Sequence, residues 1–260
     1  MVAKGSSNGY HTALPDSRRS LSLRLMEATL ENSTTTTTPL TRIHKLIGRR
    51  MAFSKQTKPC FHLDAHVDVT NLMGMRPKLR KSLGIRITSN TFFIHALALA
   101  AREYPLMVGA IRGEYVKIAE SINVGFAVNT AQGLVVPVIR HADTRSLSEI
   151  ARQEDALTKR ARSNQLTLEE IENETIALSN LGVYGIDSFF GIVPPPASTI
   201  LSVGNVIKTA VPAGPGSIDH RKIMSLTVAV DARIVDEMYA ARFMRYFGQL
   251  LEDPAQLTLM

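Results

Sequence analysis

The sequence has few of the residues on which disulfide frameworks, membrane spans and nucleic-acid surfaces depend. It contains no tryptophan, aromatic residues make up 6% of it, and Cys60 is the single cysteine. One cysteine excludes a disulfide within the chain and fits a reducing cytoplasm, where we expect the protein to reside. There is no run of about 18 apolar residues and no secretory signal, so we expect neither a membrane span nor export.

Positive charge is in excess, but it is spread along the chain. The 30 lysines and arginines outnumber the 23 acidic residues, which gives a formal net charge of +7. Nucleic-acid surfaces combine a basic stripe with stacking aromatic residues, and this combination is missing, so we expect no nucleic-acid partner. An anionic cofactor such as coenzyme A is an equally good use for the surplus charge.

The chain is long enough for one sizeable core preceded by a tail. Its 260 residues are 45% hydrophobic. Residues 1–40 are rich in small polar residues, and residues 33–39 form a run of serine, threonines and proline, a composition typical of solvated, extended backbone. We therefore expect a flexible tail or linker over residues 1–40 and one folded domain over residues 41–260.

Hydrophobic periodicity predicts both helices and strands in this domain. Residues 41–51 carry an apolar helical stripe, and residues 61–70 alternate strictly between apolar and polar side chains. We predict helices over residues 41–51, 70–82, 89–102, 146–162 and 236–251, and strands over residues 61–70, 107–111, 115–118, 122–128, 133–139, 176–179, 199–206 and 224–230. The mixture indicates a single α/β or α+β domain.

Two histidines on the strand over residues 61–70 raise the question of a metal site. His62 and His66 project from the same side of this strand because they are four residues apart. At that spacing they are about 13 Å apart, too far to share one ion. We predict no metal, and a polar or subunit-facing surface instead.

Several segments together resemble one enzyme family. Residues 231–243 read Asp-Ala-Arg-Ile-Val-Asp-Glu-Met-Tyr-Ala-Ala-Arg-Phe, and Ser179 precedes the turn Asn-Leu-Gly at residues 180–182. Residues 61–70, 133–147 and 194–204 continue the pattern. Over residues 41–260 the chain resembles the catalytic domain of the dihydrolipoamide acyltransferases of 2-oxo acid dehydrogenase complexes.

This resemblance implies a fold and an assembly. The fold would be that of chloramphenicol acetyltransferase, with a mixed sheet flanked by helices, assembling as trimers or higher oligomers with each active site at a subunit boundary. Coenzyme A, or acetyl-coenzyme A as the acyl donor, would enter a channel opposite the acyl acceptor. No metal takes part, and residues 1–40 are too short for a lipoyl domain, so we expect no lipoyl group on this chain.

The resemblance also assigns roles to residues, with one departure. The family's catalytic histidine, which deprotonates the acceptor, is replaced by Ala232. Ser179 matches the serine whose hydroxyl donates a hydrogen bond to the oxyanion. Asp236 matches an aspartate that pairs with an arginine to keep the shape of the site, and Arg50 is the expected partner, although Arg49 lies next to it. Glu237 stands where the family usually has glycine.

No other residue is a convincing replacement for the base. His220 lies in a segment that mimics the start of the signature, but we interpret it as a surface histidine. His141 and His44 have no recognisable spacing to a nucleophile, and Asp231 or Glu237 would be a weak base because an ordinary carboxyl pKa is about 4. Ala232 is therefore either an engineered replacement or a natural loss.

Three functions remain open from the sequence. The first is an acyl-coenzyme A dependent acyltransferase acting on a small-molecule or carrier-bound hydroxyl, as in natural-product biosynthesis, or on dihydrolipoamide. The second is a non-catalytic core component, a pseudo-enzyme of a 2-oxo acid dehydrogenase-type complex. The third is a ligand-binding or regulatory use of the channel. The absence of a lipoyl domain fits either a stand-alone protein or a catalytic core cut from a longer one.

Overall fold

The structure is a computed structural model that describes residues 37–131 and 133–258. The predicted tail or linker over residues 1–40 lies outside the described residues except for residues 37–40. Among the described helices, none combines the length and the apolar character needed to cross a membrane.

Five long helices form where the sequence predicts them. They are α2 (Arg42–Thr57), α3 (Thr70–Leu83), α4 (Ser89–Glu103), α5 (Leu147–Arg162) and α6 (Glu237–Glu252). Side chains at the starts of α5 and α6 accept hydrogen bonds from the first turn, Ser146 from the N–H of Glu149 and Asp236 from that of Tyr239. Short 3-10 turns span Pro105–Val108, Ala142–Thr144, Leu168–Glu170, Gly182–Tyr184 and Gln256–Thr258.

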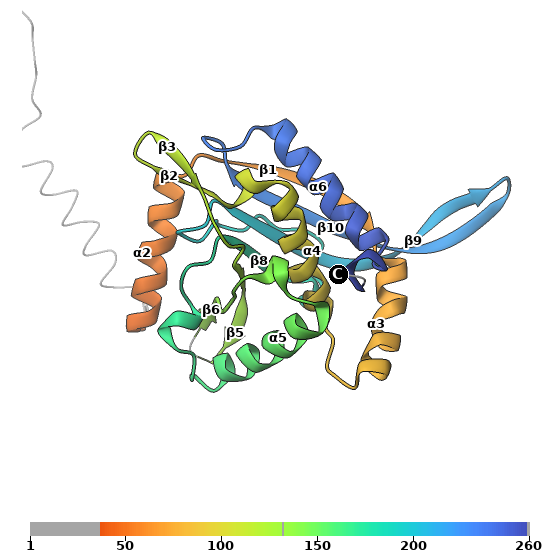
Figure 1. Cartoon of the computed structure of the whole chain (residues 1–260), viewed down its shortest axis with the longest axis horizontal. Coiled ribbons are helices and arrows are strands. Elements are labelled where there is room, and N and C mark those ends of the chain that lie inside the picture. The colour runs from red at the N-terminus through yellow and green to blue at the C-terminus, as the bar shows by residue number, and fades with distance from the viewer. Residues whose placement is uncertain (1–36, 132, 259–260) are drawn as a thin grey trace, which may run out of the picture. The chain divides into compact units, whose positions relative to one another are not determined.

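The strands build one mixed sheet and two small hairpins (Figure 1). The sheet has the order β1-β10-β9-β8-β4-β7, with β8 parallel to β9 and to β4 and the other pairs antiparallel. Its strands are β1 (Cys60–Asp68), β4 (Val124–Phe126), β7 (Val138–Ile139), β8 (Ile176–Asn180), β9 (Thr199–Gly214) and β10 (Ser217–Asp231). The hairpins pair β2 (Gly109–Arg112) with β3 (Tyr115–Ile118) and β5 (Val128–Thr130) with β6 (Gly133–Val135). The predicted mixed sheet flanked by helices is confirmed.

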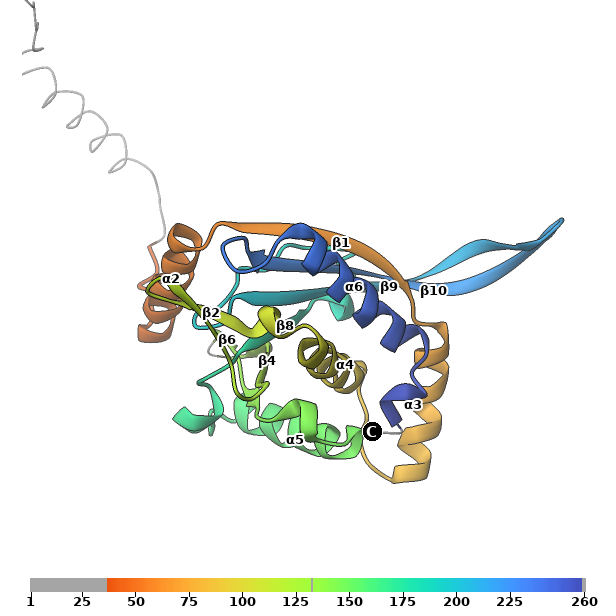
Figure 2. The same ribbon diagram turned by 45° about the horizontal axis from the view of Figure 1, so that its top comes forward.

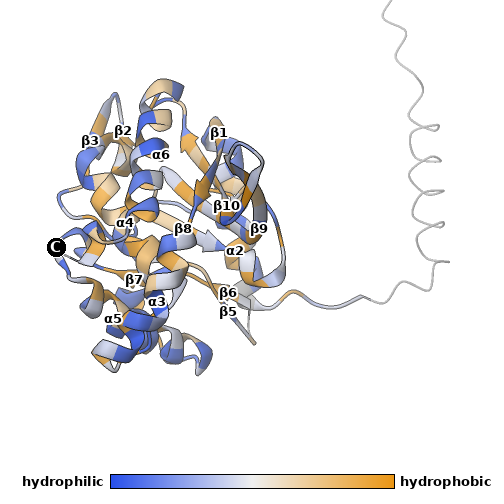
Figure 3. Ribbon diagram, turned by 90° about the vertical axis from the view of Figure 1, so that its right-hand side faces the viewer, coloured by the Kyte–Doolittle hydropathy of each residue, from blue (hydrophilic) through white to orange (hydrophobic). Residues whose placement is uncertain are grey.

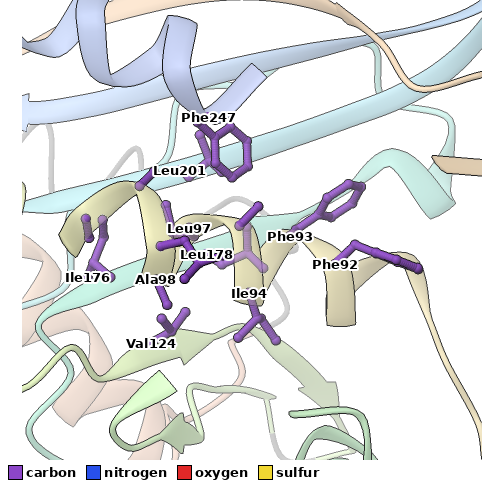
Figure 4. Packing of buried hydrophobic residues seen from close by; sticks show 14 of the residues in the cluster. Phe92, Phe93, Ile94, Leu97, Ala98, Val124, Ile176, Leu178, Leu201 and Phe247 are labelled. Carbon is purple, nitrogen blue, oxygen red and sulfur yellow. The ribbon is translucent and has the colours of Figure 1, made fainter. Parts of the chain in front are cut away.

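Helix α4 lies in the middle of the domain. Its residues 91–101 are all buried, and it packs against α5, α6 and β4 (Figure 2). Side chains of α4, β4, β8, β9 and α6 meet there (Figure 4), and hydrophobic colour runs along α4 (Figure 3). Phe93, Leu97 and Phe247 are at most 1% exposed. This core supports the sheet from the face that α4 and α6 cover.

The hairpin of β9 and β10 is longer than predicted. The expected strands at residues 199–206 and 224–230 continue through residues 207–222 into an arm that extends beyond the sheet (Figure 1). Most side chains of the arm are exposed, so no buried face imposes an alternating pattern that the sequence could reveal. The predicted strand at residues 107–111 is also partly wrong, because Pro105–Val108 form a 3-10 turn before β2 begins at Gly109.

Candidate active site

Ser179 lies near the end of β8, in the sheet and beside a rigid turn. It is half-buried and stands opposite Ser202 of β9. The next residue, Asn180, accepts a hydrogen bond from the N–H of Gly182 at 2.9 Å and donates one to Oδ1 of Asn90 at 2.7 Å. These hydrogen bonds hold the turn against the start of α4 and so fix the position of the backbone next to Ser179.

Two glycines let the turn pack directly against its neighbours. A Cβ atom at Gly182 would lie 2.2 Å from the carbonyl oxygen of Gly204, and a Cβ atom at Gly204 would lie 1.8 Å from that of Asp187. Real Cβ contacts essentially never fall below 3.0 Å, so side chains at these positions would push backbone against backbone. The Ser179 turn therefore depends on glycine at both positions.

Ala232 follows directly after the last residue of β10. It is exposed, and its N–H donates to the carbonyl oxygen of Pro59 at 3.0 Å, which continues the pairing of β10 with β1. This turn carries the methyl side chain where the family's base is expected. Nothing at position 232 itself can take up a proton.

The residue before Ala232 belongs to a tight ion pair. Asp231 is 1% exposed, and Arg233 donates to it from Nε at 2.8 Å, from a terminal nitrogen at 2.6 Å and from the backbone at 3.2 Å. Burial opposes ionisation of Asp231, but the hydrogen bonds from Arg233 outweigh it and lower the pKa of this carboxyl. Asp231 is therefore an ionised structural group at neutral pH.

Asp236 caps helix α6, and the predicted Arg50–Asp236 ion pair is not formed within this chain. Asp236 accepts from the N–H of Tyr239 at 2.7 Å. The guanidinium of Arg50 instead lies 3.3 Å from the carboxylate of Glu174, which is almost fully buried. Glu174 is distant in sequence, so no local signal predicted its contact with Arg50. Burial raises the pKa of Glu174, while its own backbone N–H and Arg50 oppose the shift.

One face of α2, together with Lys58 just after the helix, binds the segment that leads into β9. The sequence did not predict this contact. Arg50, Ser54 and Lys58 are spaced by four residues, so they share a face of the helix. They donate hydrogen bonds to the carbonyl oxygens of Pro195, Val193 and Ala197, respectively. Burial lowers the pKa of Lys58, although Asp231 opposes the shift. Arg50 thus positions backbone through its bonds to Glu174 and to the carbonyl oxygen of Pro195, and not through the predicted partner Asp236.

Ser179 and Ala232 lie far apart within one chain. The register places Ser179 beside Ser202, and Ser202 beside Thr227 of β10, so two strand spacings separate Ser179 from β10. Ala232 lies five residues beyond Thr227. With about 3.3 Å per residue and 4.8 Å between strands, the two Cα atoms are about 20 Å apart. One serine and one base from the same chain could not reach a single reacting carbonyl, which requires contacts of about 3 Å from each.

A basic cavity of about 510 Å³ lies close to the Ser179 turn. It is lined by Arg76, Pro77, Arg80, Lys81, Arg86, Ile87 and Thr88. Arg86 pairs with Asp155, but Arg76, Arg80 and Lys81 have no carboxylate partner within the described residues. Arginine side chains without carboxylates suit phosphate groups.

A chain of polar contacts joins this cavity to Ser179. Arg76 donates to Oγ of Ser89 at 2.9 Å, and the next residue, Asn90, receives the amide hydrogen bond of Asn180. Asn180 is the neighbour of Ser179. The cavity and the Ser179 turn therefore both contact the start of α4. Composition suggested an anionic ligand, but only the fold gathers these basic residues into one cavity.

The other histidines weighed from the sequence lie elsewhere. His220 belongs to the exposed arm of β10, within the strand and not before it as predicted. His62 packs its ring edge-on against Phe190, and His66 contacts Ser225. Among the described residues there is no group of three or more histidines, cysteines and acidic residues that could hold a metal ion.

The chain is similar to known acyltransferase components. It is 36% identical over 227 residues to dihydrolipoyllysine-residue acetyltransferase component 2 of the mitochondrial pyruvate dehydrogenase complex of Arabidopsis thaliana, covering 85% of this chain and 42% of that protein. It is 35% identical over 225 residues to the corresponding component of Rickettsia bellii, covering 85% and 54%. The chain thus spans about half the length of the curated relatives it matches.

Solved structures and a family model agree with this similarity. The dihydrolipoamide acetyltransferase of Azotobacter vinelandii, investigated for the role of a serine, a histidine and an asparagine in its catalytic mechanism, matches with a TM-score of 0.83 and 27% identity over 87% of this chain and 95% of that one. The cubic core of the pyruvate dehydrogenase multienzyme complex gives the same values. The model for 2-oxoacid dehydrogenases acyltransferase (catalytic domain) matches residues 32–259. The chain belongs to this family of acyltransferase catalytic domains.

Proposed function

We propose that the chain transfers an acyl group, such as acetyl, from coenzyme A to the hydroxyl or thiol of a small-molecule or carrier-bound acceptor. The observation that carries this proposal is the preserved Ser179 turn beside a basic cavity. The turn orients an oxyanion donor, and the cavity supplies charge for an anionic acyl donor. Both are what acyl transfer from a phosphorylated thioester requires.

Ser179 would donate its hydroxyl hydrogen bond to the oxygen of the thioester as it becomes an oxyanion. One such donor lowers the barrier by about 3 kcal/mol. The Azotobacter vinelandii enzyme offers a parallel, because its investigated histidine and asparagine are four residues apart, as are Ala232 and Asp236 here. Asp236 would then support the site by capping α6 and holding the end of the Ala232 turn.

The basic cavity would bind the phosphate groups of coenzyme A. Arg76, Arg80 and Lys81 bring three positive charges that no described carboxylate neutralises. Titration calorimetry of coenzyme A against the double variant Arg80→Gln, Lys81→Gln tests this step. We expect affinity to fall by about tenfold or more and to become less sensitive to salt. Equal affinity and an unchanged salt dependence would show that the phosphates bind elsewhere.

A site of this kind requires two copies of the chain. Ser179 and Ala232 are about 20 Å apart within one protomer by strand geometry, so the serine of one protomer would face position 232 of its neighbour. We therefore propose a homotrimer or a higher oligomer with sites between protomers. The cubic core that this chain resembles is consistent with such an assembly. Sedimentation equilibrium tests it, and a persistent monomer would contradict it.

A second candidate is a non-catalytic core component, and Ala232 is the observation that favours it. A chain without a base at position 232 would keep the fold and the assembly while losing turnover. The two candidates separate in one assay with acetyl-coenzyme A, dihydrolipoamide and hydroxylated acceptors, run with the native chain and with Ala232→His. If neither version acylates any acceptor, the catalytic proposal fails and the structural role is favoured.

The setting of the reaction is part of the same proposal. The acceptor would be either dihydrolipoamide or a hydroxylated intermediate of natural-product biosynthesis, and the single cysteine fits a cytoplasmic location. Product analysis with both acceptor types distinguishes the two branches.

A further inference from the structure

Position 232 of this chain gives acyl transfer no proton acceptor, a point that rests on the proposed function. Ala232 is exposed at the end of β10, where its methyl group can take up no proton. Ser179 and its turn remain able to stabilise an oxyanion. The site therefore keeps one of its two chemical functions.

The neighbouring carboxylates cannot supply the missing base. Both oxygens of Asp231 accept hydrogen bonds from Arg233, and the carboxylate is buried. Asp236 uses Oδ1 to cap α6 at the N–H of Tyr239. The hydrogen bonds from Arg233 lower the pKa of Asp231, which makes this carboxylate a weaker base than a free one.

The nearby nitrogen bases are also engaged. Lys58 lies two residues before Cys60, which pairs with Asp231, and Asp231 is among the charges that act on Lys58. The ammonium of Lys58 donates to the carbonyl oxygen of Ala197. His62 stands three residues further back in register, opposite Ala229. Within one protomer, none of these groups is free to deprotonate an acceptor at position 232.

The charged groups at this end of the strand balance one another. Lys58 and Arg233 carry two positive charges, and Asp231 and Asp236 carry two negative charges, so these four groups leave no net charge beside Ala232. No surplus positive charge among these groups lowers the pKa of an acceptor, so the acceptor has to bring a low pKa of its own.

We propose that the acyl acceptor of this chain is a nucleophile that is already ionised at neutral pH, either a low-pKa thiol or an acidic hydroxyl. The anion attacks the thioester carbonyl, a new bond from sulfur or oxygen to the acyl carbon forms, and the bond from that carbon to the sulfur of coenzyme A breaks. The electron pair leaves with the coenzyme A thiolate, which takes a proton from water. No proton has to be removed from the acceptor, so no base is required.

The test is a pH-rate series with acetyl-coenzyme A and thiols of similar size whose pKa values lie below and above about 8.5, the ordinary thiol value. The product is separated by liquid chromatography. For the native chain we expect kcat/KM to rise with the ionised fraction of each thiol, so that the midpoint of the profile moves from thiol to thiol. The low-pKa thiols should react at least about tenfold faster at pH 7.

The variant Ala232→His provides the contrast, with Ala232→Asn as the size-matched variant that has no base. In the histidine variant we expect an inflection near pH 6.5 that is common to all thiols, and a gain of about 10²- to 10⁴-fold for the least acidic ones. The asparagine variant should show neither.

Three results would decide against this inference. A native profile with one midpoint shared by every thiol would mean that the protein supplies a base. A native chain that acylates un-ionised hydroxylated acceptors but no ionised thiol would overturn the inference and leave the proposed function intact. If neither protein acylates any thiol, the proposed function fails and the inference fails with it.

Discussion

The ion pair of Asp231 and Arg233 gives a quantitative prediction about the turn that carries Ala232. Replacing Arg233 by methionine keeps a long apolar side chain but removes the two guanidinium hydrogen bonds at 2.8 and 2.6 Å. Asp231 is then left with the backbone N–H of residue 233 at 3.2 Å. A buried charge that loses its partner costs about 3–5 kcal/mol. Because the side chain of Arg233 is 44% exposed, water can replace part of the interaction, so we expect a loss of about 1–3 kcal/mol.

The pH dependence follows from the direction of the pKa shift. The pKa of Asp231 is lowered in the native protein, so its ion pair contributes stability above the unfolded value of about 3.9 and loses it as pH falls. In Arg233→Met, burial is opposed only by the backbone N–H of residue 233 and by Lys58, so we expect the pKa of Asp231 to rise, which penalises folding further as pH rises. The difference in unfolding free energy between native and variant should therefore be larger at pH 7 than at pH 3.

Urea unfolding at a fixed protein concentration measures this difference. Arg242→Met is the matched control, because Arg242 is exposed on α6 and pairs with no carboxylate among the described residues. We expect the control to change stability by less than about 0.5 kcal/mol. An Arg233→Met protein as stable as the control, or equally destabilised at both pH values, would refute the interpretation of Asp231 as an ionised structural group.

Three further predictions concern the scaffold. Burial raises the pKa of Glu154, so its protonated carboxyl favours folding below about pH 4, and this contribution is lost as pH rises. By urea titration, Glu154→Gln should therefore be about 1 kcal/mol more stable than the native chain at pH 8 and equally stable at pH 4. Gly204→Ala should lose about 3 kcal/mol because its Cβ meets the carbonyl oxygen of Asp187, whereas Gly48→Ala, which meets nothing, should gain up to about 1 kcal/mol in the same assay. Phe247→Ala, at a fully buried position, should lose about 3–5 kcal/mol in thermal or urea unfolding, and a loss below about 1 kcal/mol would contradict the packing around α4.

Most helices and strands of the fold could be predicted from local sequence patterns. Strict alternation over residues 61–70 predicted β1, which spans Cys60–Asp68, and Ser146 predicted the start of α5 through its cap. These signals are local, because strand alternation and helix capping depend on residues close in sequence. The exposed arm at residues 207–222 has no buried face, so its sequence shows no apolar–polar alternation from which its length could be predicted.

At the site, the sequence could not predict contacts between residues that are far apart in the chain. Arg50 and Glu174 are 124 residues apart, and the bonds of Lys58 and Ser54 to the segment before β9 span 139 residues each. Such contacts appear only once the sheet brings the segments together. The positions of Ser179 and Ala232 could be inferred from motifs, whereas their separation within one chain required the strand order.

Subunit complementation tests most directly whether Ser179 of one protomer works with position 232 of another. The native chain has the serine but no base, and the double variant Ser179→Ala, Ala232→His has the base but no serine. Each of these two chains alone should acylate dihydrolipoamide slowly. Subunits of both chains that are unfolded together and refolded as a mixture should show an activity well above the summed activity of the two separate proteins. Ala232→His alone is the reference for the activity of a complete site. A mixture no more active than its separate components would contradict a site shared between protomers.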